Sequence, residues 1–250
     1  MNTAPPRIFD RTRSSAKWNR ARTRQKLGGA ANYLNETLGD DLAERLDFMN
    51  FTGGKALIVG DAPEPLSRML LDSGTVINAA PLGLFDEEAP DKFEAYDLVI
   101  HLLGLGMVND LPGALIHARN ALADGGLFMA AFPGAGSLPV LRQLALVADG
   151  DRPAARMHPQ VDNRAGTALL ERAGFSRQVV DSYAVNVRYS AAERLVEDLR
   201  DHGLTSSLAS PAPPVTRTGW ERARKTFDDL REDDGKVTET FEILTLTGWR

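Results

Sequence analysis

The sequence predicts a doubly wound α/β fold built on a mostly parallel sheet. Short apolar runs alternate with amphipathic segments through the first half of the chain, and glycines or prolines separate them. Two long segments of alternating apolar and polar residues, 179–189 and 238–246, follow in the second half. Alternation of strands and helices is typical of parallel sheets covered by helices on both faces, and period-two alternation is typical of half-buried strands.

The composition agrees with a globular protein. The 250 residues are 43% hydrophobic and 25% charged, with a net charge of -5, so no nucleic-acid partner is expected. The absence of cysteine excludes disulfides, thiolate metal sites and thiol nucleophiles, and no histidine stands at metal-ligand spacing, so no metal is expected. No apolar run approaches the ~20 residues of a membrane span, and no apolar signal region is present. We therefore expect a cytoplasmic protein.

The N-terminus is strongly basic. Residues 1–26 contain eight lysines and arginines and one acid, Asp10. Such an arm is either a solvated, partly disordered terminus or a binding segment for an acidic partner, an anionic membrane surface or RNA. We predict two units, residues 1–50 with the basic arm and one helix, and residues 51–250 with the α/β domain.

The elements follow from the apolar pattern. Leu34, Leu38, Leu42 and Leu46 recur every four residues and predict a helix that ends near Asn50. Strands are predicted at 56–60, 76–77, 98–100, 127–132, 179–189 and 238–246. Helices are predicted after Pro63 through Leu71 and at 111–122, 137–147, 165–173, 190–202 and 219–231, with Ser137 as an N-cap. Residues 81–95 are acidic and irregular.

Three stretches in the middle of the chain resemble a known family. They are Asp97–Ile100, Val108–Leu115 with its Asn-Asp-Leu-Pro-Gly run, and Ala121–Phe128. The chain is similar there to class I methyltransferases, in the branch of the biotin-synthesis malonyl-carrier-protein methyltransferases and of the bacterial relatives of a mitochondrial complex I assembly factor, an arginine hydroxylase. The terminal runs Pro5–Arg11 and Thr240–Trp249 resemble the assembly-factor side.

The resemblance implies a Rossmann-like fold with a doubly wound, mostly parallel seven-stranded sheet and an antiparallel C-terminal strand. It also implies S-adenosyl-L-methionine as the cofactor, bound beyond the carboxyl ends of the first strands. The residues expected to contact it are Gly60, Asp61, Asn78, Asp86 and Leu102.

Several of these positions depart from the family pattern. Only Gly60 remains of a glycine-rich loop that lets backbone approach the cofactor, and Glu64 stands where the last glycine is expected. The second strand lacks the acid that binds both ribose hydroxyls, and Asn78 is the nearest polar residue. An amide accepts more weakly than a carboxylate, so we expect weakened cofactor binding.

Methyl transfer needs mainly proximity and alignment, so the sequence shows no obligatory catalytic set. His101, on a central strand, is the one candidate for a general base, and the alternative is a packed core histidine.

Two hypotheses about function follow. The first is a methyltransferase-family enzyme acting on a carrier-bound acyl chain or a protein side chain. The second is a non-catalytic, methyltransferase-like protein that binds a partner, for example in assembly of respiratory complex I.

Overall fold

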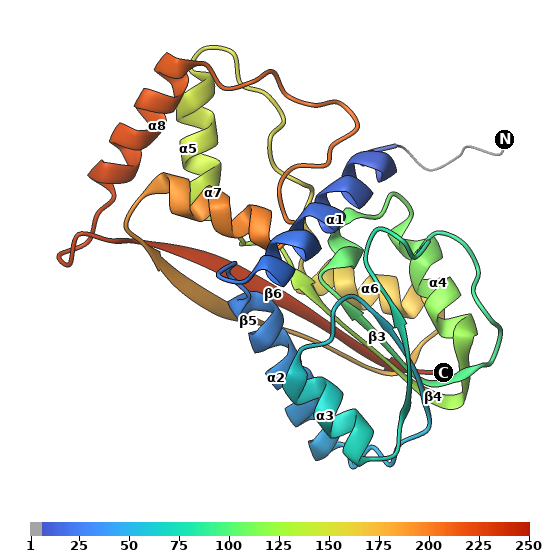
Figure 1. The fold of residues 1–250 in the computed structure, drawn as a ribbon. Helices are drawn as coiled ribbons and strands as arrows, with labels where there is room; N and C mark the ends of the chain where they lie inside the picture. The colour runs from blue at the N-terminus through green and yellow to red at the C-terminus, as the bar shows by residue number, and fades with distance from the viewer. Residues whose placement is uncertain (1–6) are drawn as a thin grey trace, which may run out of the picture.

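The sheet organises the molecule, and the computed structural model describes residues 7–250 (Figure 1). Within these residues the sheet has six strands in the order β2-β1-β3-β4-β6-β5. Their bounds are β1 (Lys55–Val59), β2 (Val76–Ala80), β3 (Tyr96–Leu102), β4 (Leu122–Pro133), β5 (Ser176–Tyr189) and β6 (Val237–Trp249). The pairs from β2 to β4 are parallel, whereas β6 runs antiparallel to both of its neighbours, β4 and β5.

Eight α-helices and one 3-10 helix connect the strands in residues 7–250. They are α1 (Arg11–Leu27), α2 (Tyr33–Phe48), α3 (Glu64–Asp72), η1 (Gly104–Met107), α4 (Leu111–Ala121), α5 (Pro139–Asp149), α6 (Asn163–Ala173), α7 (Ala192–Asp201) and α8 (Arg217–Asp229). None of the helices in this described part of the chain has the length and apolar character needed to span a membrane.

Both faces of the sheet are covered, as a parallel sheet requires. Along β3, Val99 and His101 face a small cavity beneath α4, whereas Leu102 faces a different cavity beside α1 and α2. Leu98, Ile100 and Leu102 are at most 1% exposed, so this strand is the centre of the core. The α/β prediction and the antiparallel C-terminal strand are confirmed.

The expected number of strands was wrong. The resemblance implied seven, but the described residues form six, because residues 81–95 between β2 and β3 adopt turns and bends. This segment combines Pro81 and Pro90 with five acids, so it lacks the apolar alternation that a strand needs to pair. Strand β2 therefore forms the edge of the sheet.

The basic arm is not a disordered terminus over its described part. Residues 11–27 form α1, which begins with Asp10 as N-cap, since its Oδ1 accepts from the amide of Arg13 at 3.0 Å. Trp18 and Ala21 are buried, and α1 packs on α7. Pro5 and Pro6 of the N-terminal motif lie outside the described residues. The division of the chain at residue 50 stays a prediction.

Two residues of the methyltransferase-like middle segment hold backbone in place. The Asn109 Oδ1 accepts from the amides of Ile8 and Phe9, both at 2.8 Å, and so fixes the segment before α1. Asp110 caps α4 by accepting from the amide of Gly113 at 3.0 Å. Ser137, however, is not an N-cap: α5 begins after Leu138, and the Ser137 hydroxyl instead exchanges hydrogen bonds with the backbone of Glu242.

Candidate functional site

A cavity of about 450 Å³ lies where β1 and β3 end, at the carboxyl edge of the sheet. We call it the polar cavity. Asp61, Ala62 and Pro63 line it from the loop after β1, and Leu102 and Leu103 line it from the end of β3. Leu82 lines it from the segment after β2. The remaining lining comes from α1, the start of α2 and the end of α7: Trp18, Ala21, Arg22, Gln25, Lys26, Asn32, Asn35, Asp201 and His202.

Gly60 is required by close packing of β1 on β3. Its φ of +116° is unfavourable for a side chain, and a Cβ there would lie 2.9 Å from the Leu102 Cβ. The next residue, Asp61, is exposed and lines the polar cavity, and its carboxylate makes no ion pair within residues 7–250. Glu64 does not line it, because its carboxylate pairs with Arg68 on the surface of α3.

Three of the five expected cofactor contacts, Gly60, Asn78 and Asp86, lie outside the lining of the polar cavity, although Gly60 packs directly against Leu102. The Asn78 side chain on β2 contacts the carbonyl of Ala56, with 3.5 Å between Nδ2 and O. Asp86 forms an ion pair with Arg11 of α1, at 2.7 Å between Nη2 and Oδ1. The structure thus brings Gly60, Asp61 and Leu102 together and places Asn78 and Asp86 elsewhere.

Helix α1 covers the polar cavity and is held there by polar contacts on both sides. The Arg22 Nη1 donates to the carbonyl of Leu82 at 3.1 Å, and Arg24 pairs with the buried Asp201 on α7. Trp18 packs against Gly203, where an added Cβ would lie 2.3 Å from the Trp18 ring. The basic arm therefore finds acidic and carbonyl partners within the chain itself.

His101 faces the opposite side of the sheet. It is 4% exposed and lines a cavity of about 20 Å³ beneath α4, with its Nε2 3.5 Å from the Glu87 Oε1. Neither ring nitrogen has a hydrogen-bond partner in the described chain, and the ring lines neither of the two larger cavities. This position does not bring His101 to the site. No group of three or more His, Asp or Glu residues suited to a metal occurs in residues 7–250.

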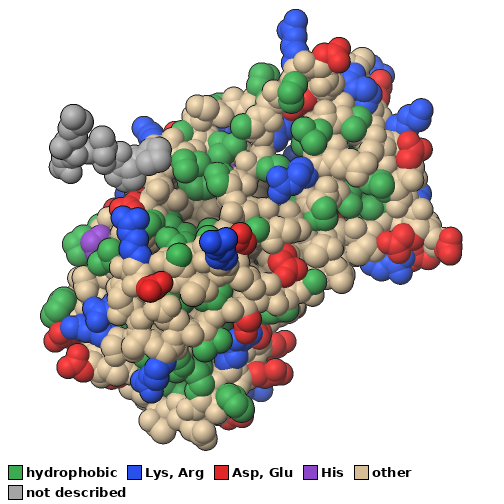
Figure 2. Space-filling model, turned by 180° about the vertical axis from the view of Figure 1, so that it is seen from behind, with side chains coloured by type: hydrophobic (Ala, Val, Ile, Leu, Met, Phe, Trp, Pro, Cys, Tyr) green, Lys and Arg blue, Asp and Glu red, His purple; other side chains and the backbone are tan. Residues whose placement is uncertain are grey.

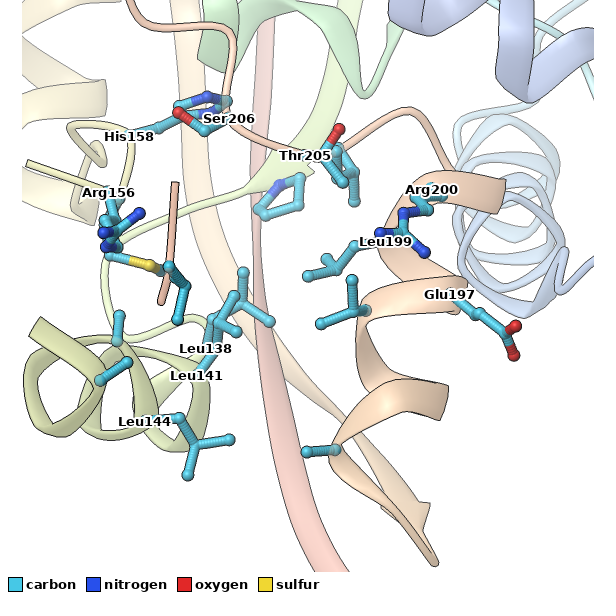
Figure 3. Close-up of a pocket in the computed structure, with 18 of the residues that line it drawn as sticks. Leu138, Leu141, Leu144, Arg156, His158, Glu197, Leu199, Arg200, Thr205 and Ser206 are labelled. Carbon is cyan, nitrogen blue, oxygen red and sulfur yellow. The ribbon is translucent and has the colours of Figure 1, made fainter. Parts of the chain in front are cut away.

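A second, larger cavity of about 670 Å³ adjoins the polar cavity at Leu103, which lines both. We call it the apolar cavity. Leucines of α5 and α7 point into it, among them Leu138, Leu141 and Leu199 (Figure 3). Val215, Trp220 and Ala223 line it from α8 and the segment before it. On the face seen in Figure 2, hydrophobic side chains gather along a hollow beside the α5 and α8 region.

Two leucines of the apolar cavity have strained backbones. Leu103 has φ +64° and Leu138 has φ +61°, in the left-handed region that a branched side chain rarely adopts. Such conformations cost of order 1–3 kcal/mol and cluster at functional sites. Here they direct Leu103 to the junction of the two cavities and Leu138 to the start of α5.

His158 supplies a polar group to the apolar cavity. Its Nε2 accepts from the amide of Ser207 at 2.9 Å, and its ring packs edge-on against Phe9. Burial, together with the charge of Lys17, lowers the pKa of His158 to about 4, so the ring is neutral at pH 7. Since Nε2 accepts, the proton of the neutral ring is on Nδ1, which makes no hydrogen bond within residues 7–250.

Comparison with known proteins agrees with this geometry. The sequence is 30% identical over 216 residues to the arginine-hydroxylase NDUFAF5, mitochondrial, of Mus musculus, covering 84% of this chain and 61% of that protein. It is 28% identical over 165 residues to the malonyl-[acyl-carrier protein] O-methyltransferase of Laribacter hongkongensis, covering 66% and 54%. The chain thus spans only about half to three fifths of the length of these two relatives. No protein-family model matches.

Among solved structures, a methyltransferase of Bacillus halodurans superposes with a TM-score of 0.53 at 12% identity, covering 83% of this chain and 97% of that one. That likeness concerns the fold. The sequence relatives and this fold together support membership of the class I methyltransferase superfamily. Within it, the chain is a homologue of the NDUFAF5 arginine hydroxylases and of the malonyl-carrier-protein O-methyltransferases.

The residues present fit S-adenosylmethionine in part. The cavity volume suits a ligand of that size, and the unpaired Asp61 carboxylate suits its cationic methionine end. The ribose side has no carboxylate on β2, and Asp86 is held by Arg11. The described chain therefore provides the charge for one end of the cofactor and weaker acceptors for the other.

Proposed function

We propose that this protein binds S-adenosylmethionine in the polar cavity and an acceptor molecule in the apolar cavity, and that it transfers a group between them. The observation that carries this proposal is that Leu103 lines both cavities, so that their ligands would meet at the carboxyl edge of the sheet. Proximity and orientation supply most of the rate enhancement in such a transfer.

The relatives support this cofactor, and their names limit the chemical class of the acceptor. One is named an arginine hydroxylase and the other a methyltransferase acting on malonyl-[acyl-carrier protein]. We propose the corresponding acceptor classes here, a protein side chain or a carrier-bound acyl chain. One relative is named for hydroxylation and the other for methylation. We therefore propose the two binding sites, the polar and the apolar cavity, and no particular reaction. We propose a cytoplasmic location.

A second candidate function is a non-catalytic, methyltransferase-like protein that binds a partner, such as a respiratory complex I assembly factor. The cover formed by α1 favours it, because Arg11 and Arg24 engage Asp86 and Asp201 and hold this helix over the polar cavity. Arg13 and Arg20 make no ion pair within residues 7–250 and would face an acidic partner.

Titration of S-adenosylhomocysteine into wild type and Asp61→Asn tests the first candidate. Loss of the carboxylate should weaken binding about 10-fold, since a hydrogen-bonded charge pair contributes ~1.5 kcal/mol or more. Asp72→Asn, at the exposed end of α3 and outside the cavity lining, is the matched control and should change nothing. Equal binding by both variants would reject Asp61 as a ligand and favour the second candidate.

A further inference from the structure

We infer that the apolar cavity binds the hydrocarbon chain of an acyl group, with the acyl carbonyl at His158. This inference deepens the proposed function and rests on it for the assignment of this cavity to the acceptor. It chooses between the two acceptor classes and adds that the chain must be long enough to fill the cavity.

The walls of the cavity suit a hydrocarbon. Leu138, directly before α5, and Leu141 and Leu144 on α5 line one side, and Val196 and Leu199 line it from α7. In Figure 3, His158, Thr205 and Ser206 lie at one end of the cavity and Leu144 lies toward the other. A slender amphipathic ligand matches this division, because apolar surface is stabilised by burial while a polar end needs hydrogen bonds.

A cationic side chain such as arginine does not suit the same walls. The acids that line the cavity are Glu193 and Glu197, and both are paired elsewhere, with Arg224 and Arg194. Glu197 also points away from the cavity (Figure 3). Arg156 is itself paired with Asp149, and Arg200 adds a positive charge to the lining, so a further cation would be buried without a counter-charge.

The polar end provides one directed donor. His158 is neutral at pH 7, and its hydrogen bond from Ser207 leaves the proton on Nδ1. That N–H suits the carbonyl oxygen of a thioester, ester or amide, which accepts and carries no charge. Leu103, with its strained backbone, borders the same cavity and also lines the polar cavity, where the donor group of the cofactor would lie.

The experiment measures binding of two thioesters of N-acetylcysteamine, octanoyl and acetyl, by calorimetry. Six further methylenes that enter the cavity should tighten binding by about 100-fold or more. The thioether S-octyl-N-acetylcysteamine, which lacks the carbonyl, should bind about 5-fold more weakly than the octanoyl thioester. Equal binding of octanoyl and acetyl thioesters, or binding of neither, overturns the inference.

Variants of residues in and beside the apolar cavity test where the octanoyl hydrocarbon chain binds. Ala145 lines the cavity from α5, whereas the adjacent Leu146 is 56% exposed and does not. Ala145→Trp should reduce octanoyl binding at least 10-fold, and Leu146→Trp should leave it unchanged. In His158→Phe the thioester and the thioether should bind equally. A preference for the thioester that survives in His158→Phe rejects His158 as the donor.

A parallel titration with S-adenosylhomocysteine separates this inference from the proposed function. Ala145→Trp should bind S-adenosylhomocysteine as wild type does, because Ala145 does not line the polar cavity. Octanoyl binding without S-adenosylhomocysteine binding would leave the acyl site standing and reject the transfer function. The reverse result would reject the acyl chain and leave the cofactor site standing.

Discussion

Arg11 holds the carboxylate of Asp86 with both terminal nitrogens, at 2.8 Å from Nη1 to Oδ2 and 2.7 Å from Nη2 to Oδ1. This pair joins the first turn of α1 to the acidic segment between β2 and β3. Asp86 is one of the residues that the sequence suggested as a contact of the cofactor. Its partner in the described chain is instead Arg11 of the basic arm.

Removal of the ion pair between Arg11 and Asp86 should free the carboxylate and tighten cofactor binding. In Arg11→Gln, we expect the dissociation constant of S-adenosylhomocysteine to fall about 5-fold, since one hydrogen bond contributes about 1 kcal/mol. The free energy of unfolding should drop by less than about 1 kcal/mol, because the Arg11 and Asp86 side chains are 54% and 42% exposed. Arg20→Gln, exposed on the same helix, is the control for charge. Unchanged affinity in Arg11→Gln would show that Asp86 is no cofactor ligand.

Docking of α1 should depend on Gly203. Its φ is +71°, and an added Cβ would meet the Trp18 ring. Gly203→Ala should therefore release α1, which limited trypsin digestion detects as rapid cleavage among its arginines. Gly74→Ala shares the backbone strain, with φ +76°, but has open space around the new methyl group. It should lose about 1 kcal/mol of stability and keep α1 protected. Equal digestion of the two variants would mean that the Trp18 contact does not hold α1.

Glu239 should be needed for the start of α5. It is fully buried, and its carboxylate accepts from the amides of Val140 and Leu141 at 3.2 and 2.8 Å. Glu239→Ala leaves both amides unsatisfied and should lower the free energy of unfolding by about 2–4 kcal/mol, measured by urea denaturation. Glu171→Ala, exposed on α6, should change it by less than about 0.5 kcal/mol. A small effect at Glu239 would mean that water or another group takes its place.

His158 should make stability depend on pH. Its folded pKa of about 4 lies below its ordinary value of 6.5, so between these pH values the unfolded chain binds a proton that the folded chain does not. The stabilising contribution is complete above pH 6.5 and is lost as the pH falls toward 4. Thermal unfolding of His158→Phe should lose part of this dependence. The pKa of His202 is also lowered by burial, so a residual slope should remain in the variant. Identical pH profiles would show that the pKa of His158 is the same in the folded and unfolded chains.

Much of the fold was predictable from the apolar pattern, but α1 was not. The leucines at 34, 38, 42 and 46 predicted α2, and all four are buried. In α1 only Trp18 and Ala21 are buried, and its other contacts are polar ones with residues far along the chain, such as the pair of Arg24 with Asp201. Local sequence does not reveal such partners, because tertiary contacts create them.

The candidate site, too, was predictable in one part and not in the other. The ends of the predicted strands indicated that Gly60, Asp61 and Leu102 lie close together, since the carboxyl ends of neighbouring parallel strands meet at one edge of the sheet. The apolar cavity was missed because its walls come from five distant segments: 103–107, 133–148, 156–160, 192–206 and 215–223. His158 lies in a loop with no periodic pattern. The proline-rich loops around it were the one signal of an irregular, non-core region.

The central claim is that the polar cavity binds S-adenosylmethionine despite its weakened acceptors. Calorimetric titration of the purified protein with S-adenosylmethionine and S-adenosylhomocysteine tests it most directly. We predict dissociation constants in the micromolar range for both ligands. No heat at millimolar ligand would contradict this claim.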